Sequence, residues 1–235
     1  MKDLTHGPIT GHLIAMAIPM AIGMLVQTLY FVVDLYFVAQ LGDAALAGVS
    51  AAGNFTFAIM ALTQMLGVGT VALISHAVGA KEQAQASLVF NQSLVLAAAC
   101  AGITLVVGYA AGGPYMTTLG ADAATAAAGA TYLRWYLPGL ALQFALISMG
   151  SALRGTGIAK PMMVVQLGTV VVNTVLAPVL IAGWVTGRPL GVAGAGLAST
   201  IAVTVGVVMM FVYFRRLEHY VGFRREECRP RLHVW

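Results

Sequence analysis

The sequence predicts an all-α integral membrane protein in which six transmembrane helices form a single lobe. Of the 235 residues, 60% are hydrophobic and only 9% are charged, and the mean hydropathy is +0.88. A soluble domain has about a quarter charged residues, so this chain could not cover a surface that faces water. Its apolar runs suit helices that cross a ~30 Å hydrocarbon core and are too long for the strands of a barrel.

Six apolar runs give the six predicted spans, and glycine, proline and charged residues cluster in the segments between them. The first run contains no charged residue from Leu13 to Val33, and QLGDAA separates it from the second. VGAKEQAQ follows the second run and AGGPYMTTLGADAAT follows the third. LRGTGIAKP and WVTGRPLG precede the fifth and the sixth. The predicted spans are 12–39, 45–76, 87–111, 130–153, 160–183 and 191–214.

Lysine and arginine predict the orientation, because they collect on the cytoplasmic side of membrane proteins. Ten of the 12 basic residues lie on one predicted side, against Arg134 and Arg188 on the other. We therefore expect a multi-pass protein of the plasma membrane with both termini in the cytoplasm. The predicted domains are a six-helix lobe over 1–214 and a basic cytoplasmic tail over 215–235. Orientation accounts for the net charge of +4, so we expect no nucleic-acid partner.

Asp34 is the only acidic residue that falls inside a predicted span. A charge near mid-bilayer is costly and usually faces a cavity on a transport pathway. The alternative is that Asp34 reaches the outer interface, one or two helical turns away. Tyr30 and Gln27 lie four and seven residues earlier and share its helix face, which favours a position inside the bundle.

Polar residues also repeat at helical spacing in the later spans. Gln166, Thr169 and Asn173 share one face of the fifth span, and Thr200 lies in the sixth. Taken singly, each fits an interhelical hydrogen bond, typically worth under ~2 kcal/mol. Pro19 removes a hydrogen bond inside the first span and predicts either a static kink or a hinge.

Enzyme motifs are missing from the spans. We find no G-x-S-x-G, no H-E-x-x-H and no clustered histidines, so we expect neither catalysis nor a cofactor. A channel or a purely structural membrane protein fits the composition but leaves Asp34 unexplained.

Five segments, in order, resemble the N-terminal lobe of the multidrug and toxic compound extrusion (MATE) transporters. They are VVDLYFVAQLGDAALAGVS (32–50), GVGTVALISHAVGAKEQAQAS (67–87), ALRGTGIAKPMM (152–163), NTVLAPVLIAG (173–183) and GVAGAGLASTIA (191–202). The resemblance implies an antiporter that expels cationic or amphipathic compounds using a proton or sodium gradient. It implies that Asp34 is the coupling carboxylate, with Tyr30, Asn173 and Thr200 in the same ion-coupling set and Pro19 as a hinge.

One departure from the family pattern bears on the coupling ion. Many relatives have an aspartate in a pattern like N-x-x-x-D-P, where this chain has Ala177 followed by Pro178. A sodium site at Asp34, Asn173 and Thr200 would have one charge fewer among its oxygen ligands. Because a single carboxylate can still take up and release a proton, we expect protons rather than sodium.

The second departure is length, since family members have twelve spans in two similar lobes. Six spans give both lobes the same orientation, so a homodimer or a separately encoded second lobe could complete the transporter. The other interpretation is a truncated, non-transporting fragment. A flippase of lipid-linked sugars from the same superfamily is the alternative function, but it would be expected to line its cavity with several cationic groups, and we find none in the spans. The partners expected are small cationic or amphipathic substrates and the lipid bilayer.

Overall fold

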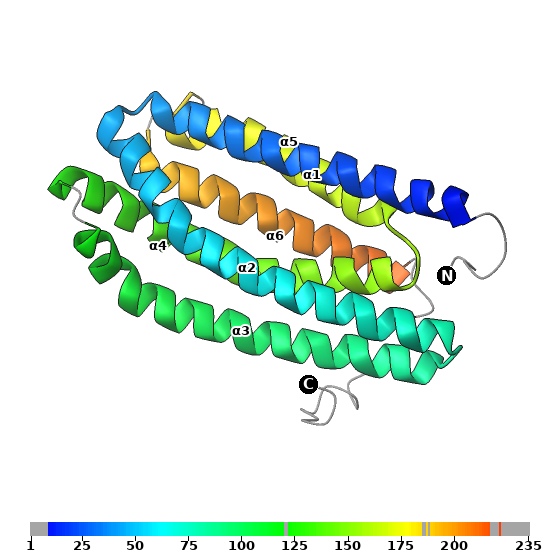
Figure 1. The fold of residues 1–235 in the computed structure, drawn as a ribbon. Coiled ribbons are helices and arrows are strands. Elements are labelled where there is room, and N and C mark those ends of the chain that lie inside the picture. Colours follow the sequence, from blue (N-terminus) through cyan, green and yellow to red (C-terminus); the bar gives the residue numbers. More distant parts are fainter. Residues whose placement is uncertain (1–8, 120–121, 185–186, 188, 217–220, 222–235) are drawn as a thin grey trace.

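The computed structural model describes residues 9–119, 122–184, 187, 189–216 and 221, and it consists of six long helices (Figure 1). All six are long and apolar enough to cross a membrane, and the described ranges contain no strand. The prediction of an all-α, six-span membrane protein is therefore confirmed. The helices are α1 (Ile9–Ala39), α2 (Asp43–Gly79), α3 (Gln83–Thr118), α4 (Ala123–Gly155), α5 (Lys160–Ile181) and α6 (Val192–Arg216).

Successive helices run in opposite directions, so α1 begins and α6 ends at the same end of the bundle (Figure 1). We call this the terminal end, and it also holds the α2–α3 and α4–α5 turns. The other three connections lie at the opposite, distal end. In the α4–α5 turn Gly157 has φ +81°, a conformation that glycine adopts without steric cost.

The helix α4 lies at the centre of the bundle, where it packs against α2, α3 and α6. It is the most deeply buried helix of the six, whereas α1 is the most exposed and packs mainly on α5. Glycines bring the backbones together: a Cβ on Gly196 of α6 would stand 2.7 Å from the carbonyl oxygen of Tyr132, and one on Gly48 of α2 would stand 2.8 Å from the backbone nitrogen of Gly129. Small residues allow this close approach where lipid supplies no hydrophobic driving force.

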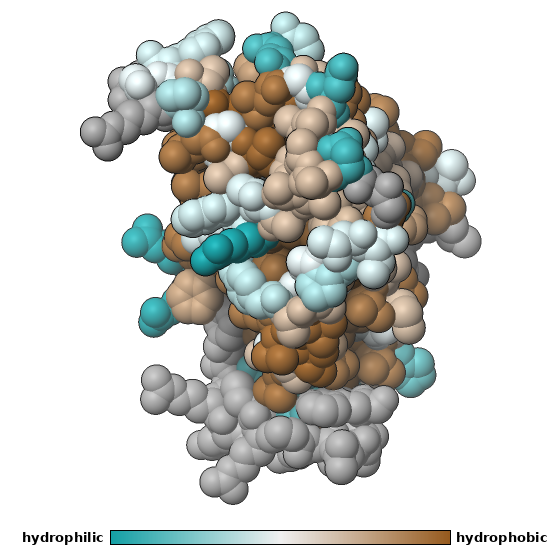
Figure 2. Space-filling view, turned by 90° about the vertical axis from the view of Figure 1, so that its left-hand side faces the viewer, coloured by the Kyte–Doolittle hydropathy of each residue, from teal (hydrophilic) through white to brown (hydrophobic). Residues whose placement is uncertain are grey.

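Apolar side chains cover much of the outer surface of the bundle. On α1 they include Leu25, 71% exposed, and Met24, 68% exposed. Figure 2 looks onto the distal end, where polar residues lie among apolar ones that continue onto the flanks. The exposed apolar side chains on the flanks suit contact with lipid or with another apolar protein surface.

The predicted boundary between the third and fourth spans is wrong. The predicted loop 112–129 is mostly helical, because α3 continues through Pro114 to Thr118 and α4 begins at Ala123. The hydroxyl of Thr117 donates to the Pro114 carbonyl oxygen at 2.8 Å, and Asp122 caps the alanine-rich start of α4. In lipid the backbone must be satisfied within a helix, which favours continuing through the proline.

Two consequences follow from these boundaries. Arg134 lies well inside α4 rather than near its start, and Arg154 also falls within it. The expectation that the spans hold no cationic group is therefore wrong for these two residues. At the other boundary, α6 extends to Arg216, two residues into the predicted tail, of which 217–220 and 222–235 lie outside the described residues.

Candidate functional site

Asp34 lies inside the bundle, near the distal end of α1. Its side chain is only 5% exposed, so the alternative of a carboxylate at the interface is excluded. The side chain of Tyr132 on α4 lies beside the carboxylate. Its Oδ1 atom has no hydrogen-bond partner among the described residues. Asp34 is therefore a buried acid with at least one unpaired oxygen.

The inward face of α1 explains why Asp34 is buried while the rest of the helix is exposed. Pro19, Gly23, Asp34 and Val38 are buried and recur at multiples of about one turn, as the helical period requires. Gln27 and Tyr30 on this stripe are half-buried. Pro19 thus sits on the packed side of a helix that continues from Ile9 to Ala39, and its role as a hinge stays a prediction.

Asn173 of α5 joins three helices through its amide. Its Nδ2 atom donates to the hydroxyl of Tyr30 on α1 at 3.2 Å and to Oγ of Ser199 on α6 at 3.3 Å. The side chain is fully buried, yet its Oδ1 atom has no partner among the described residues.

The two free oxygens define the site. Among the residues described, Asp34 Oδ1 and Asn173 Oδ1 are the only buried side-chain nitrogen or oxygen atoms without a hydrogen bond. Tyr30 lies one turn before Asp34 on α1 and bonds to Asn173, so it links the two residues. Buried polar atoms are nearly always paired, and exceptions call for an explanation such as a water, an ion or a functional role.

Thr200 is turned away from this pair. Its hydroxyl donates to the carbonyl oxygen of Trp135 on α4 at 2.6 Å, and it is the preceding residue, Ser199, that meets Asn173. Successive residues of a helix point about 100° apart, so Ser199 faces α5 while Thr200 faces α4.

The Trp135 carbonyl lies beside a break in the hydrogen bonding of α4. Pro138 has no N–H and cannot donate to the carbonyl of Arg134, four residues earlier. The hydroxyl of Tyr109 on α3 donates to that carbonyl instead, at 3.2 Å. Hydroxyls from α3 and α6 therefore hold two adjacent carbonyls of α4, one turn from Tyr132.

The polar residues predicted to share one face of the fifth span make different contacts. Gln166 lies against Gly23 of α1, and the hydroxyl of Thr169 donates to the Gln166 carbonyl of its own helix at 2.7 Å. Only Asn173 reaches the Asp34 site. One turn further on, Ala177 is fully buried in the same apolar cluster as Val38.

Three residues of the site were missed by the sequence reasoning: Tyr132, Tyr136 and Ser199. Tyr132 and Tyr136 lie one turn apart on α4, with ring centroids 5.4 Å apart, and both interact electrostatically with Asp34. Their i, i+4 spacing inside an apolar span was a usable signal. Ser199 offered none beyond its position beside Thr200.

The groups at this site suit the binding of a proton or a small cation. A single carboxylate, surrounded by hydroxyls and one amide, can hold a proton or contribute oxygens to a small cation. No group of three or more His, Cys, Asp or Glu side chains comes together in the described ranges. Together, the fold and the site define a membrane-spanning helical lobe in which Asp34, near the distal end of α1, is the one buried acid among the described residues.

Comparison with known proteins identifies the family. The sequence model of the MatE family matches residues 19–179, so the chain belongs to the MatE family. It is 25% identical to the multidrug export protein MepA of Staphylococcus aureus (strain MRSA252), over 98% of this chain and 51% of MepA. It is 26% identical to the probable multidrug resistance protein YoeA of Bacillus subtilis (strain 168), over 88% of this chain and 45% of YoeA.

Solved structures confirm the fold as a lobe of a MATE transporter. A crystal structure of MATE in the bent conformation superposes with a TM-score of 0.89 at 27% identity, over 97% of this chain and 50% of that protein. An outward-facing multidrug resistance MATE family transporter of the MOP superfamily gives a TM-score of 0.88 at 27% identity, over 97% and 50%. The chain thus spans about half the length of the relatives it matches.

Proposed function

We propose that this chain forms one lobe of a secondary transporter that expels cationic or amphipathic compounds in exchange for protons. The observation that carries the proposal is the pair of unpartnered buried oxygens on Asp34 and Asn173. The names of the relatives, a multidrug export protein and a probable multidrug resistance protein, support the substrate class. In this proposal both termini face the cytoplasm and the lobe lies in the plasma membrane.

Asp34 is the coupling residue in this mechanism. A proton binds at the unpaired Oδ1, and Tyr132 lies beside the carboxylate. The Asn173 amide ties α1 to α6 through Tyr30 and Ser199. Gain or loss of the proton changes the charge held between α1 and α4, and Pro19 allows α1 to respond.

Two observations favour protons over sodium. A sodium site at Asp34, Asn173 and Thr200 would need the Thr200 oxygen, but the Thr200 side chain faces α4, where its hydroxyl donates to the Trp135 carbonyl. At the position where the family pattern has a second acid, this chain has Ala177, and Ala177 is fully buried. The lobe thus offers one carboxylate, which suits a proton better than a metal cation.

The lipid-linked sugar flippase is the weaker candidate, because it requires cationic groups along a central cavity. The two arginines inside α4 have other surroundings: Arg134 lines a groove toward α3, and Arg154 donates to Ser151 at 2.6 Å.

The test replaces Asp34 by asparagine in an assembly that transports, either a homodimer or a pairing with a second lobe. In liposomes with an imposed proton gradient, Asp34→Asn should abolish movement of a fluorescent cation and leave membrane insertion intact. Asp43→Asn, at the exposed start of α2, is the matched control and should transport normally. Normal gradient-driven transport by Asp34→Asn would contradict the proposal.

The coupling ion is tested with the same liposomes. Removing sodium at a fixed proton gradient should leave the transport rate of the wild-type assembly unchanged. Loss of transport on removing sodium would show that sodium, rather than the proton, is the coupling ion. Thermal protection of the purified protein by sodium that Asp34→Asn removes would show the same.

A further inference from the structure

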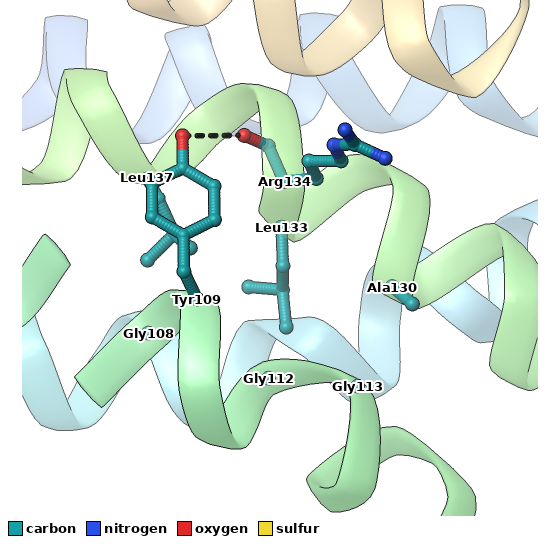
Figure 3. Close-up of a pocket in the computed structure, with 8 residues that line it drawn as sticks. All are labelled: Gly108, Tyr109, Gly112, Gly113, Ala130, Leu133, Arg134 and Leu137. Atoms are coloured by element: carbon teal, nitrogen blue, oxygen red, sulfur yellow. Dashed lines mark hydrogen bonds between the residues drawn. The ribbon is translucent and has the colours of Figure 1, made fainter. Parts of the chain in front are cut away.

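A groove outside the Asp34 site lies between α3 and α4 in the distal half of the bundle (Figure 3). Its volume is about 360 Å³, within the ~300–1,000 Å³ of typical ligand sites. Gly112 and Leu133 form its floor, and Tyr109 and Arg134 stand along it.

Missing side chains on α3 create the groove. A Cβ on Gly113 would meet nothing within 4 Å, and one on Gly112 would make only an ordinary contact, 3.8 Å from Cδ1 of Leu133. At Gly108, one turn before Gly112, the helices are in tight contact through Leu137. The space therefore opens from Gly112 toward the distal end of the bundle.

Arg134 brings a charge to this groove at an unusual depth. It lies 11 residues after Ala123, where α4 begins, or roughly 17 Å along the helix at ~1.5 Å per residue. The 33 residues of α4 extend ~50 Å, so about 10 Å projects at each end of a centred ~30 Å hydrocarbon core. The Cα atom of Arg134 is then about one turn inside the hydrocarbon, where an arginine charge is costly.

The geometry of α4 directs this charge to the headgroups. Helical side chains lean toward the N-terminus of their helix, and the N-terminus of α4 is at the distal end. Arg134 is exposed and runs along α4 in the direction of Ala130 (Figure 3). Tyr109 is 53% exposed and Trp135 45% exposed, as is typical of aromatic residues at the membrane interface.

The charge of Arg134 has no anionic partner in the described part of the chain. Four acidic residues are described, and none forms an ion pair with Arg134. Asp34 is buried with Tyr132, and Asp122 accepts from Thr125. An anion from outside the chain therefore suits this position, and a guanidinium fits the oxygens of a phosphate.

We propose that the α3–α4 groove binds one anionic phospholipid from the leaflet at the distal end. The Arg134 guanidinium holds the lipid phosphate, and an acyl chain fills the groove over Gly112. A net negative headgroup is preferred because a zwitterionic lipid brings its own cation, which competes with Arg134 for the phosphate. This site is independent of the transport proposal, since it uses none of the residues around Asp34.

The test measures binding of dioleoyl phosphatidylglycerol and dioleoyl phosphatidylcholine to the purified full chain. Native mass spectrometry counts retained lipids, and a lipid titration of thermal unfolding gives apparent affinities. Arg134→Gln should weaken phosphatidylglycerol binding about tenfold, the loss expected of a charge-assisted hydrogen-bonded contact. Arg134→Lys should retain part of the affinity, and Lys160→Gln, an exposed cation at the start of α5, should retain all of it.

A second variant keeps the proposal testable if Arg134→Gln fails to fold. Gly112→Leu fills the groove while Arg134 is unchanged, and it should also weaken phosphatidylglycerol binding. Tight binding by both Arg134→Gln and Gly112→Leu would overturn the proposal. Equal affinity of the wild-type chain for the two lipids would overturn it as well.

Discussion

Two neighbouring residues of α6, Ser199 and Thr200, contact different helices. The two residues are adjacent, yet the hydroxyl of Ser199 accepts from Asn173 while that of Thr200 donates to Trp135 of α4. Ser199 therefore directly contacts a member of the proposed ion-coupling set. Thr200 instead contacts the α4 backbone beside Pro138, about one turn from Tyr132.

The charge on Asp122 is expected to make the stability of the protein depend on pH. Its carboxylate accepts from the backbone N–H and the hydroxyl of Thr125, both at 2.9 Å, and these bonds hold its pKa below the usual value. Because the pKa of Asp122 is lower in the folded protein, its charge stabilises the fold at pH values above the unfolded pKa of about 4. This stabilisation is lost as the pH falls through the folded pKa.

The prediction compares the wild type with Asp122→Asn, which keeps an N-cap oxygen but removes the charge. In detergent at neutral pH the wild type should unfold at a higher temperature than the variant. The difference should shrink as pH falls below about 4, because the wild-type carboxylate becomes protonated. Melting curves by intrinsic fluorescence would measure this, and a difference that stays constant from pH 6 to pH 3 would contradict it.

At the scale of elements, Pro138 makes α4 depend on α3. Tyr109→Phe leaves the Arg134 carbonyl without its described donor, so it should destabilise the protein by about 0.5–1.5 kcal/mol, the usual net value of one hydrogen bond. In a Pro138→Ala background residue 138 regains an N–H that donates to the same carbonyl. Tyr109→Phe should then cost much less.

A double-mutant cycle checks this coupling, with the free energy of unfolding in mixed micelles as the readout. Tyr115→Phe is the control, because Tyr115 is also an α3 tyrosine but packs its ring against Phe55. Its cost should be the same in both backgrounds. An additive cycle for Tyr109 and Pro138 would show that the hydroxyl does not replace the missing N–H.

The elements also show how far sequence patterns reach. The number, type and order of the helices could be predicted, because hydrocarbon leaves the backbone few alternatives. The loop 112–129 could not, because Gly-Gly-Pro ends helices in water but α3 continues through it. Asp34 could be singled out because it is isolated in an apolar span, and Asn173 because polar residues recur at helical spacing. The positions of Tyr132 and Ser199 depend on which faces of α4 and α6 turn inward. Glycine contacts between segments distant in sequence decide these orientations.

At the scale of the whole molecule, the lobe keeps its acid inside and its apolar surface outside. The Asp34 site is enclosed by α1, α4, α5 and α6, all from this chain. On the exposed faces of α1 and α2 lie large apolar side chains such as Leu25, Phe57 and Met65, each more than 70% exposed. Proton binding could therefore take place within one lobe, while a wall for the substrate requires a second apolar surface.

The last prediction follows from this division: as a monomer, the chain does not transport. Alternating access moves one lobe against another around a shared site, and a drug-sized ligand needs 70–90% of its surface buried. The chain spans about half the length of its relatives, so one copy supplies one of two walls. We expect no efflux of a fluorescent cation from liposomes that contain single copies, and efflux only after pairing with a second copy or a second lobe. Single copies are obtained by high dilution during reconstitution and verified by cross-linking and mass measurement. Gradient-driven efflux from verified monomers would show that one lobe is sufficient and would overturn the two-lobe mechanism.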